Sequence, residues 1–259
     1  MNQKIVPHQK AFNRVKTFGD WGNGILAFTT LAAISSMALE DQLKSSDLMD
    51  KVNALNSLLI LAYFVLDLTS SYLLQKAEML RRLVFIDNSF DVNLTGKKSA
   101  GYFTNESLTP GVYKMAVNCF ENSFFSHFIS SKMLVKLAIK NIPIAAIFIA
   151  AASMGEAKIV NLIFQLSLPV VLVQQLIKLA FYVSTTETVL NNFKTLFSDL
   201  RGNPPSDQRT PEILRNVIQY ETNISWGSIR LSSSLFNKFN DELSIEWDRM
   251  KTEYLIPKQ

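Results

Sequence analysis

The sequence predicts an all-α membrane protein, with four transmembrane helices arranged as two hairpins and a helical cytoplasmic domain. Three observations lead to this fold class: four long stretches almost without charge, an uneven distribution of lysine and arginine between them, and no strand periodicity. Charged residues make up 19% of the 259 residues and hydrophobic ones 48%. The charged share is below the roughly 25% usual for soluble domains.

The four uncharged stretches have lengths suited to crossing a bilayer, which takes about 20 helical residues. Residues 21–39 and 159–177 contain no charged side chain, and residues 52–75 contain only Asp67. The stretch at 141–155 is shorter, but apolar residues precede it. A soluble alternative, in which all four are buried helices of one large α-domain, stays open.

The basic residues orient these helices. Lysine and arginine are abundant in the N-terminal tail, between the second and third stretches and in the C-terminal region, and scarce in the other two connections. Because basic residues are retained on the cytoplasmic side, we expect a multi-pass protein of the bacterial inner membrane with both termini cytoplasmic. The predicted order is a cytoplasmic tail at 1–20, a transmembrane hairpin at 21–75, a cytoplasmic helical segment at 76–138, a second transmembrane hairpin at 139–183 and a cytoplasmic helical region at 184–259.

Two helix starts are marked in the cytoplasmic part by threonine followed by proline, at Thr109–Pro110 and at Thr210–Pro211. Threonine is a good N-cap and proline is favoured in the first helical turn. The turn-forming stretch 199–211 is the predicted linker before the second start. The glycines in residues 19–24 are expected to break the chain before the first transmembrane helix.

Two apolar stripes follow these starts. The first recurs every three or four residues, which predicts one face of a helix packed in the protein core, with a lipid-facing role as the alternative. It consists of Tyr113, Val117, Phe120, Phe124 and Phe128. The second is narrow, which suits helix packing either within the chain or between subunits, so it is a candidate oligomer or partner stripe. It consists of Phe236, Phe239, Leu243, Trp247 and Met250.

Residue patterns for catalysis are missing. The chain has one cysteine, Cys119, and two histidines, and neither a metal-binding motif nor a complete phosphate-binding loop is present. We therefore expect no enzymatic activity, no cofactor and no metal.

Asp67 is the most unusual residue of the apolar stretches. An ionised aspartate at the centre of a bilayer costs about 2.5–3.5 kcal/mol on insertion scales, and such residues usually face water or another helix. Asp67 therefore either sits protonated or at the interface, or lines a wet ion path with Lys178 as a partner. Further polar candidates for a pore are Thr29, Ser36, Gln165 and Gln174, and Pro169 is a candidate gate hinge.

Two segments, AEMLRRLVFIDNSFD at 77–91 and NCFENSFFSHFISSKM at 118–133, resemble those of four-transmembrane pore-forming effectors associated with bacterial oligonucleotide signalling and anti-phage defence. The two-hairpin layout is also similar to that family. The resemblance implies a homo-oligomer that breaches the inner membrane, as in abortive infection, when a nucleotide signal or the enzyme that makes it releases the pore.

Basic residues of the cytoplasmic part would be the contacts for an oligonucleotide or cyclic nucleotide, because arginine and lysine form charge-assisted hydrogen bonds to phosphate. The alternative is that these charges set the topology and attract anionic lipid headgroups. No duplex nucleic acid is expected as a partner. The candidates are Arg81, Arg82, Lys97, Lys98, Arg209 and Arg215.

Two functions follow from these observations. The first is an oligomeric pore or ion channel gated from the cytoplasm. The second is a non-conducting membrane anchor or receptor that recruits a soluble partner through its cytoplasmic helices. A small transporter has less support, because the sequence has no detectable inverted repeat.

Overall fold

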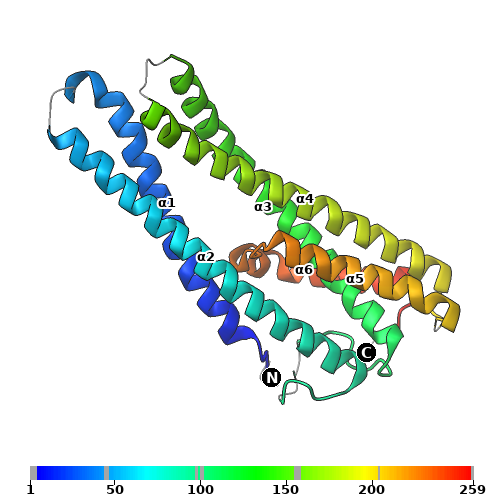
Figure 1. Cartoon of the computed structure of the whole chain (residues 1–259). Helices are drawn as coiled ribbons and strands as arrows, with labels where there is room; N and C mark the ends of the chain where they lie inside the picture. The colour runs from blue at the N-terminus through cyan, green and yellow to red at the C-terminus, as the bar shows by residue number, and fades with distance from the viewer. Residues whose placement is uncertain are drawn as a thin grey trace. The chain divides into compact units, whose positions relative to one another are not determined.

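The computed structural model describes residues 5–43, 47–96, 99, 102–154, 159–203 and 205–257, and within them the side chains at 33–34, 36–50, 53, 148 and 151–169 are excluded. The chain is 83% helical, and the described part contains no strand. The predicted all-α class is therefore confirmed. Figure 1 shows four long helices followed by two shorter ones. The helices are α1 (Gln9–Leu43), α2 (Asp47–Phe90), α3 (Val112–Met154), α4 (Ile159–Leu200), the 3₁₀ helix η1 (Asp207–Arg209), α5 (Thr210–Gly227) and α6 (Ser233–Glu253).

Helix α1 begins well before the predicted transmembrane stretch, and the glycines at 19–24 lie inside it, so the predicted chain break is wrong. Each glycine costs about 1 kcal/mol of helix propensity, which packing on a neighbouring helix can outweigh. At Gly22 an added Cβ would lie 3.9 Å from the Leu66 Cβ of α2. The glycine therefore lets the backbone of α1 approach α2 closely.

The other helix starts agree more closely with the sequence. Helix α5 begins at Thr210 with Pro211 in its first turn, although no side-chain cap bond forms there. Helix α3 begins at Val112, just after the predicted Pro110, because Gly111 adopts a φ of 146° and its N–H donates to the Ser89 carbonyl (2.8 Å).

The chain divides into two compact units. Unit 1 comprises Met1–His8, Glu78–Pro143 and Leu172–Gln259, and unit 2 comprises Gln9–Ala77 and Ile144–Val171. Helices α2, α3 and α4 contribute residues to both units. The division of α2 lies close to the predicted boundary after residue 75, whereas that of α4 comes well before the predicted one after residue 183.

Unit 1 has a dense aromatic core. The fully buried ring of Phe120 stacks on Phe197, with 5.1 Å between ring centroids, and on Phe193 at 5.9 Å. Trp247 of α6 meets the same ring edge-on at 5.3 Å. The prediction that the Tyr113–Phe128 stripe packs in the core is confirmed at Phe120, its central residue. The lone thiol of Cys119 is also fully buried in this core.

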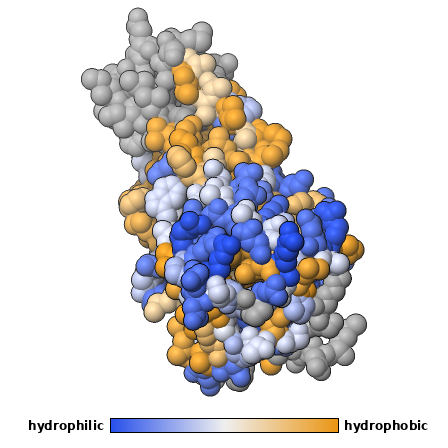
Figure 2. All heavy atoms as spheres, turned by 90° about the vertical axis from the view of Figure 1, so that its right-hand side faces the viewer, coloured by the Kyte–Doolittle hydropathy of each residue, from blue (hydrophilic) through white to orange (hydrophobic). Residues whose placement is uncertain are grey.

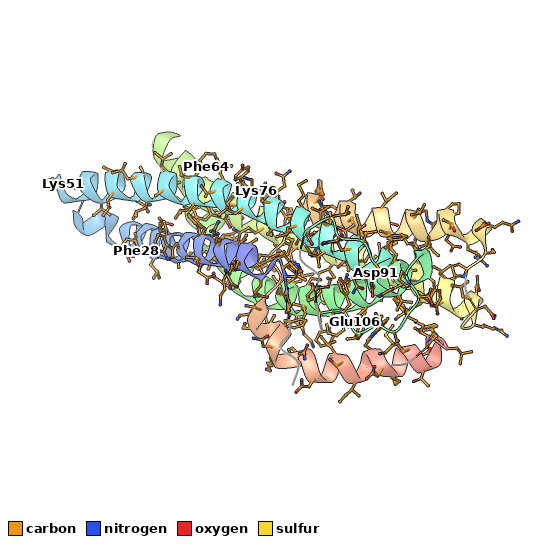
Figure 3. The ribbon with its side chains drawn as sticks, turned by 90° about the horizontal axis from the view of Figure 1, so that it is seen from below. Phe28, Lys51, Phe64, Lys76, Asp91 and Glu106 are labelled. Atoms are coloured by element: carbon orange, nitrogen blue, oxygen red, sulfur yellow. The ribbon has the colours of Figure 1, made fainter. Side chains whose placement is uncertain are left out.

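Unit 2 has a small core by comparison. Val15 of α1 is buried against Leu74 and Ala77 of α2, so the residues before position 20 form part of this unit and not a separate tail. Most large apolar side chains of α1 and α2 instead point outward, as Phe28 and Phe64 do in Figure 3. On the face drawn in Figure 2, hydrophilic residues gather in one area and hydrophobic residues dominate an adjacent one.

One described helical stretch, Ala54–Phe90 of α2, is long and apolar enough to cross a membrane. Only 6% of its most apolar 18-residue window is buried inside the protein. A helix of a soluble core would hide such a window, because buried apolar area is what stabilises a core. The finding gives support to membrane association through α2.

Candidate functional site

Asp67 lies on the outward surface of α2, so it does not point into the interior of the chain. Its neighbours Phe64 and Leu68 are exposed as well, Phe64 by 56%. Lys178 and Gln174 of α4 are also exposed. Asp67 belongs to unit 2 and Lys178 to unit 1, and their pairing stays a prediction.

Thr29 does not offer its hydroxyl to a pore in this chain. The side chain is buried, and its Oγ1 donates to the Leu26 carbonyl of the same helix (2.9 Å). Thr30 does the same at 2.6 Å. Back-bonding of this kind satisfies a hydroxyl inside an apolar environment without a partner helix. The side chains of Ser36, Gln165 and Pro169 lie outside the described residues.

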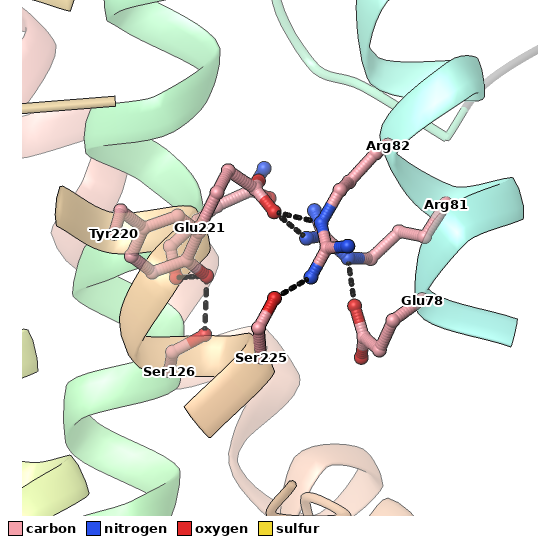
Figure 4. Close-up of polar contacts among 8 residues, drawn as sticks. Glu78, Arg81, Arg82, Ser126, Tyr220, Glu221 and Ser225 are labelled. Carbon is pink, nitrogen blue, oxygen red and sulfur yellow. Dashed lines mark hydrogen bonds and ion pairs between the residues drawn. The ribbon is translucent and has the colours of Figure 1, made fainter. Parts of the chain in front are cut away.

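Arg81 and Arg82, predicted to hold a ligand, instead join α2 to α5 through Glu221 (Figure 4). Arg81 is only 12% exposed, and its Nη2 lies 2.5 Å from the Glu221 carboxylate while its Nε lies 2.5 Å from Glu78. Arg82 donates from Nε to Glu221 (2.8 Å) and from Nη2 to the Ser225 hydroxyl. Two arginines therefore share one carboxylate in the interior of unit 1.

Electrostatics make this cluster a structural joint. Burial alone would lower the pKa of Arg81, but the carboxylates of Glu78 and Glu221 outweigh it and hold that pKa well above its usual value. A buried arginine paired in this way is not available to a ligand unless the pair breaks, which costs several kcal/mol. The prediction that Arg81 and Arg82 bind a nucleotide is therefore not supported.

Neutral hydrogen bonds extend the attachment of α5. The Tyr220 hydroxyl lies 2.8 Å from Ser126 Oγ and donates to the Asn122 carbonyl (3.2 Å), both on α3. Asn223 Nδ2 donates to Thr186 Oγ1 of α4 (2.8 Å). One face of α5 is thus bonded to α2, α3 and α4 at once.

The remaining basic candidates do not converge with this pair. Arg209 precedes α5 and forms ion pairs with Asp199 (3.2 Å) and Glu212 (2.9 Å). Arg209 and Glu221 are twelve residues apart, which is about 18 Å along a helix. Arg215 is exposed and donates to its neighbour Asn216, whereas Lys97 and Lys98 lie outside the described residues.

The candidate partner stripe of α6 is used inside the chain. Leu243, Trp247 and Met250 are buried, so these residues are not available to a subunit or partner. Phe239 packs on Phe128 of α3, with centroids 5.3 Å apart, and Phe236 on Phe125 at 6.0 Å. Of the two interpretations of the stripe, packing within the chain is the one observed.

A second buried carboxylate, Glu121 of α3, was not singled out in the sequence. Thr104 Oγ1 donates to Glu121 Oε1 (2.8 Å) and Asn105 Nδ2 to Oε2 (2.7 Å). Trp247 Nε1 donates to the same Thr104 hydroxyl (3.2 Å). Burial raises the pKa of Glu121 to about 7, against the opposing effect of the bonds from Thr104 and Asn105. Its signal in the sequence was its place beside Phe120, next to a core position.

His8 provides a third perturbed group. Its ring meets Tyr102 edge-on at 4.9 Å. Burial, assisted by the nearby charge of Arg81, lowers the pKa of His8 to about 4. The imidazole is therefore neutral at physiological pH, and a positive charge would not be tolerated beside the arginine.

The described residues contain no cluster of three or more histidine, cysteine, aspartate or glutamate side chains able to hold a metal ion. No protein-family model, curated protein or solved structure shows a significant match to the chain. The site must therefore be interpreted from its own geometry.

Proposed function

We propose that the chain is a multi-pass protein of the bacterial inner membrane that assembles into a homo-oligomeric pore, with four spanning helices and both termini in the cytoplasm. Unit 2 would lie in the lipid, and unit 1 would hold the cytoplasmic part that gates the pore. The resemblance to defence-associated effectors suggests anti-phage defence as the setting and a nucleotide-type signal as the trigger.

The exposure of Asp67 among exposed apolar residues is the observation that carries this proposal. In a bilayer, an ionised aspartate facing lipid costs about 2.5–3.5 kcal/mol. The chain by itself leaves Asp67 on the outside of α2. Neighbouring copies arranged around water would remove that cost, because Asp67 would then face an aqueous path.

Arg81 and Arg82 are left out of the proposed signal site, since Glu221 and Glu78 occupy them. Lys97 and Lys98 stay the proposed contacts for an anionic signal. A ligand that opens or closes the pore must bind one state more tightly than the other.

Ion flux through liposomes containing the purified protein tests the proposal. We expect protein-dependent flux, and we expect Asp67→Asn to change its rate or its ion selectivity. The matched control is Asp241→Asn, an exposed aspartate of α6 in unit 1, which should leave the flux unchanged. Equal effects of the two substitutions would remove Asp67 from the ion path.

A non-conducting membrane anchor is the second candidate. Leu214 and Ile218 lie one turn apart on α5 and are exposed, Ile218 by 63%. Exposed apolar side chains on a folded unit can serve as a docking surface for a soluble partner. Absence of flux in liposomes under every condition, combined with loss of partner capture in Ile218→Ser, would favour the anchor.

A further inference from the structure

A polar cavity of about 270 Å³ lies within unit 1, at the point where α2 ends and α3 begins. This volume is at the small end of the range for ligand pockets, so it suits a molecule with about ten non-hydrogen atoms. Its polar lining comes from three separate segments of the chain. The lining residues include Asp87, Asn88, Asp91, Ser99, Glu106 and Lys114.

Lys114 is the unusual member of this lining. It belongs to the first turn of α3 and is only 5% exposed. Within the described part of the chain, Lys114 has no hydrogen bond, ion pair or aromatic contact. A buried ammonium group without a partner is costly, and burying it has to be offset by an interaction.

The helix position adds to this cost. The positive end of the α3 dipole lies at its first turn, where a lysine is repelled and an anion is favoured. The first bond within the helix runs from the Met115 N–H to the Gly111 carbonyl (3.0 Å). The preceding N–H groups of the first turn have no carbonyl within the helix to bond. Lys114 and this helix end together make one wall of the cavity favourable to an anionic group.

The opposite character is found on the other wall. Asp91, which follows the last residue of α2 with a φ of 53°, and Glu106 both line the cavity (Figure 3). The C-terminal end of α2 adds the negative end of its own dipole. Asp87 is engaged locally, because it accepts from the N–H groups of Leu94 (2.6 Å) and Thr95 (3.0 Å).

The two walls are not joined to each other, since Lys114 forms no ion pair with these carboxylates. The cavity thus separates one positive from several negative side chains. Three carboxylates against one lysine give the lining a formal charge of −2, which disfavours polyanions such as oligonucleotides. A ligand that bridges the walls needs an anionic end and at least one cationic end.

We propose that this cavity binds a small basic amino acid, whose carboxylate lies at Lys114 and the start of α3 and whose ammonium groups lie at Asp91 and Glu106. The ligand class follows from the bipolar lining and the cavity volume. The proposal does not depend on pore formation, because binding is measured whether or not the protein conducts ions.

Calorimetry on the full-length protein in detergent micelles tests the site with four matched compounds. L-lysine carries the carboxylate and both ammonium groups, cadaverine lacks the carboxylate, 6-aminohexanoate lacks the α-ammonium and L-norleucine lacks the ε-ammonium. We expect L-lysine to bind most tightly, and cadaverine to bind at least about tenfold more weakly, because one charge-assisted bond is lost.

Two substitutions locate the site. Lys114→Met should weaken L-lysine binding by about tenfold or more, whereas Lys194→Met, at a half-buried lysine of α4 outside the cavity, should leave it unchanged. Asp91→Asn should also weaken binding, and asparagine tolerates the left-handed backbone there, so this variant is expected to fold.

Three outcomes would overturn the proposal. The first is that none of the four compounds binds, and the second is that cadaverine binds as tightly as L-lysine. The third is that adenosine monophosphate binds through Lys114 while L-lysine does not, which would assign the site to a phosphate ligand.

Discussion

The two units of this chain use their apolar residues in opposite ways. In unit 1 the large side chains face inward, where Phe120 contacts four other aromatic rings. In unit 2 the apolar residues of α2 face outward, and only 6% of the most apolar window is buried. The same chemistry therefore stabilises unit 1 from within, whereas unit 2 needs an apolar surrounding to cover it.

Polar residues differ between the units in the same way. Charged groups buried in unit 1 have partners, as Arg81 has in Glu78 and Glu221. In unit 2 the hydroxyl of Thr29 bonds to its own helix, and Asp67 stays on the outside. This contrast is what a water-soluble unit and a lipid-facing unit should show, because unsatisfied polar groups are costly in both.

The largest expected effect comes from emptying the core of unit 1. Trp247→Ala removes a side chain that contacts Phe120 and bonds to Thr104, and we expect a loss of about 3–5 kcal/mol in the free energy of unfolding. The control is Ile245→Ala on the same helix, where the side chain is 72% exposed, with an expected change below about 0.5 kcal/mol. Thermal unfolding in detergent, followed by aromatic fluorescence, measures both.

Breaking the ion cluster should come next. Glu221→Gln leaves Arg81 and Arg82 with reduced compensation inside unit 1, and we expect a loss of about 3 kcal/mol in unfolding free energy, since Glu78 still pairs with Arg81. Glu246→Gln removes the carboxylate of an exposed pair with Arg249 and should leave the unfolding midpoint unchanged. If both variants unfold at the same temperature, α5 is not held by this cluster.

The outward face of α2 tests the lipid side of the comparison. Leu61→Arg places a charge on that exposed face, which should cost about 2.5–3.5 kcal/mol of membrane insertion. Leu214→Arg makes the same change on the exposed surface of α5 in unit 1 and should have no effect on insertion. The measurement is the share of protein retained in membranes after alkaline carbonate extraction. Equal retention of the two variants would contradict the assignment of this face to lipid.

The smallest effect is a pH dependence confined to unit 1. Because burial raises the pKa of Glu121 to about 7, above its unfolded value of 4.5, the protonated form stabilises the fold. That contribution is complete below about pH 4.5 and is lost as the pH rises through 7, by up to about 3 kcal/mol. Unfolding midpoints measured between pH 5 and 8 should fall, and Glu121→Gln should flatten this dependence.

The neutral His8 acts in the opposite pH range. Its pKa falls from 6.5 to about 4 in the folded chain, so its contribution is present above pH 6.5 and is lost as the pH falls toward 4. A His8→Phe variant should therefore lose stability less steeply on acidification than the parent chain. An unchanged acid limb would show that other groups dominate.

Periodicity and length predicted the helices well, because a stripe such as Tyr113–Phe128 depends only on local spacing. Partners that come from distant positions could not be predicted in this way. Arg81 reads as a free basic residue in the sequence, yet Glu221, 140 residues later, neutralises it. Trp247 and Met250 likewise fit either a partner or the chain itself, and only the fold decides between them.

The glycines at 19–24 show a different limit. Local propensity predicted a break there, but the close packing of Gly22 against Leu66 and Tyr63 is a tertiary effect. Lys114 was equally silent in the sequence, since nothing near it indicates that its side chain is buried.

The position of Cys119 has a practical consequence for all of these experiments. It is the only cysteine of the chain, it is fully buried, and burial raises the pKa of its thiol well above the usual value. Because the thiolate is the reactive form, maleimide reagents should leave the native protein unlabelled. A cysteine introduced at Leu61 or at Leu214 would then be the single reactive thiol, and its labelling in intact cells would report directly which side of the membrane that position occupies.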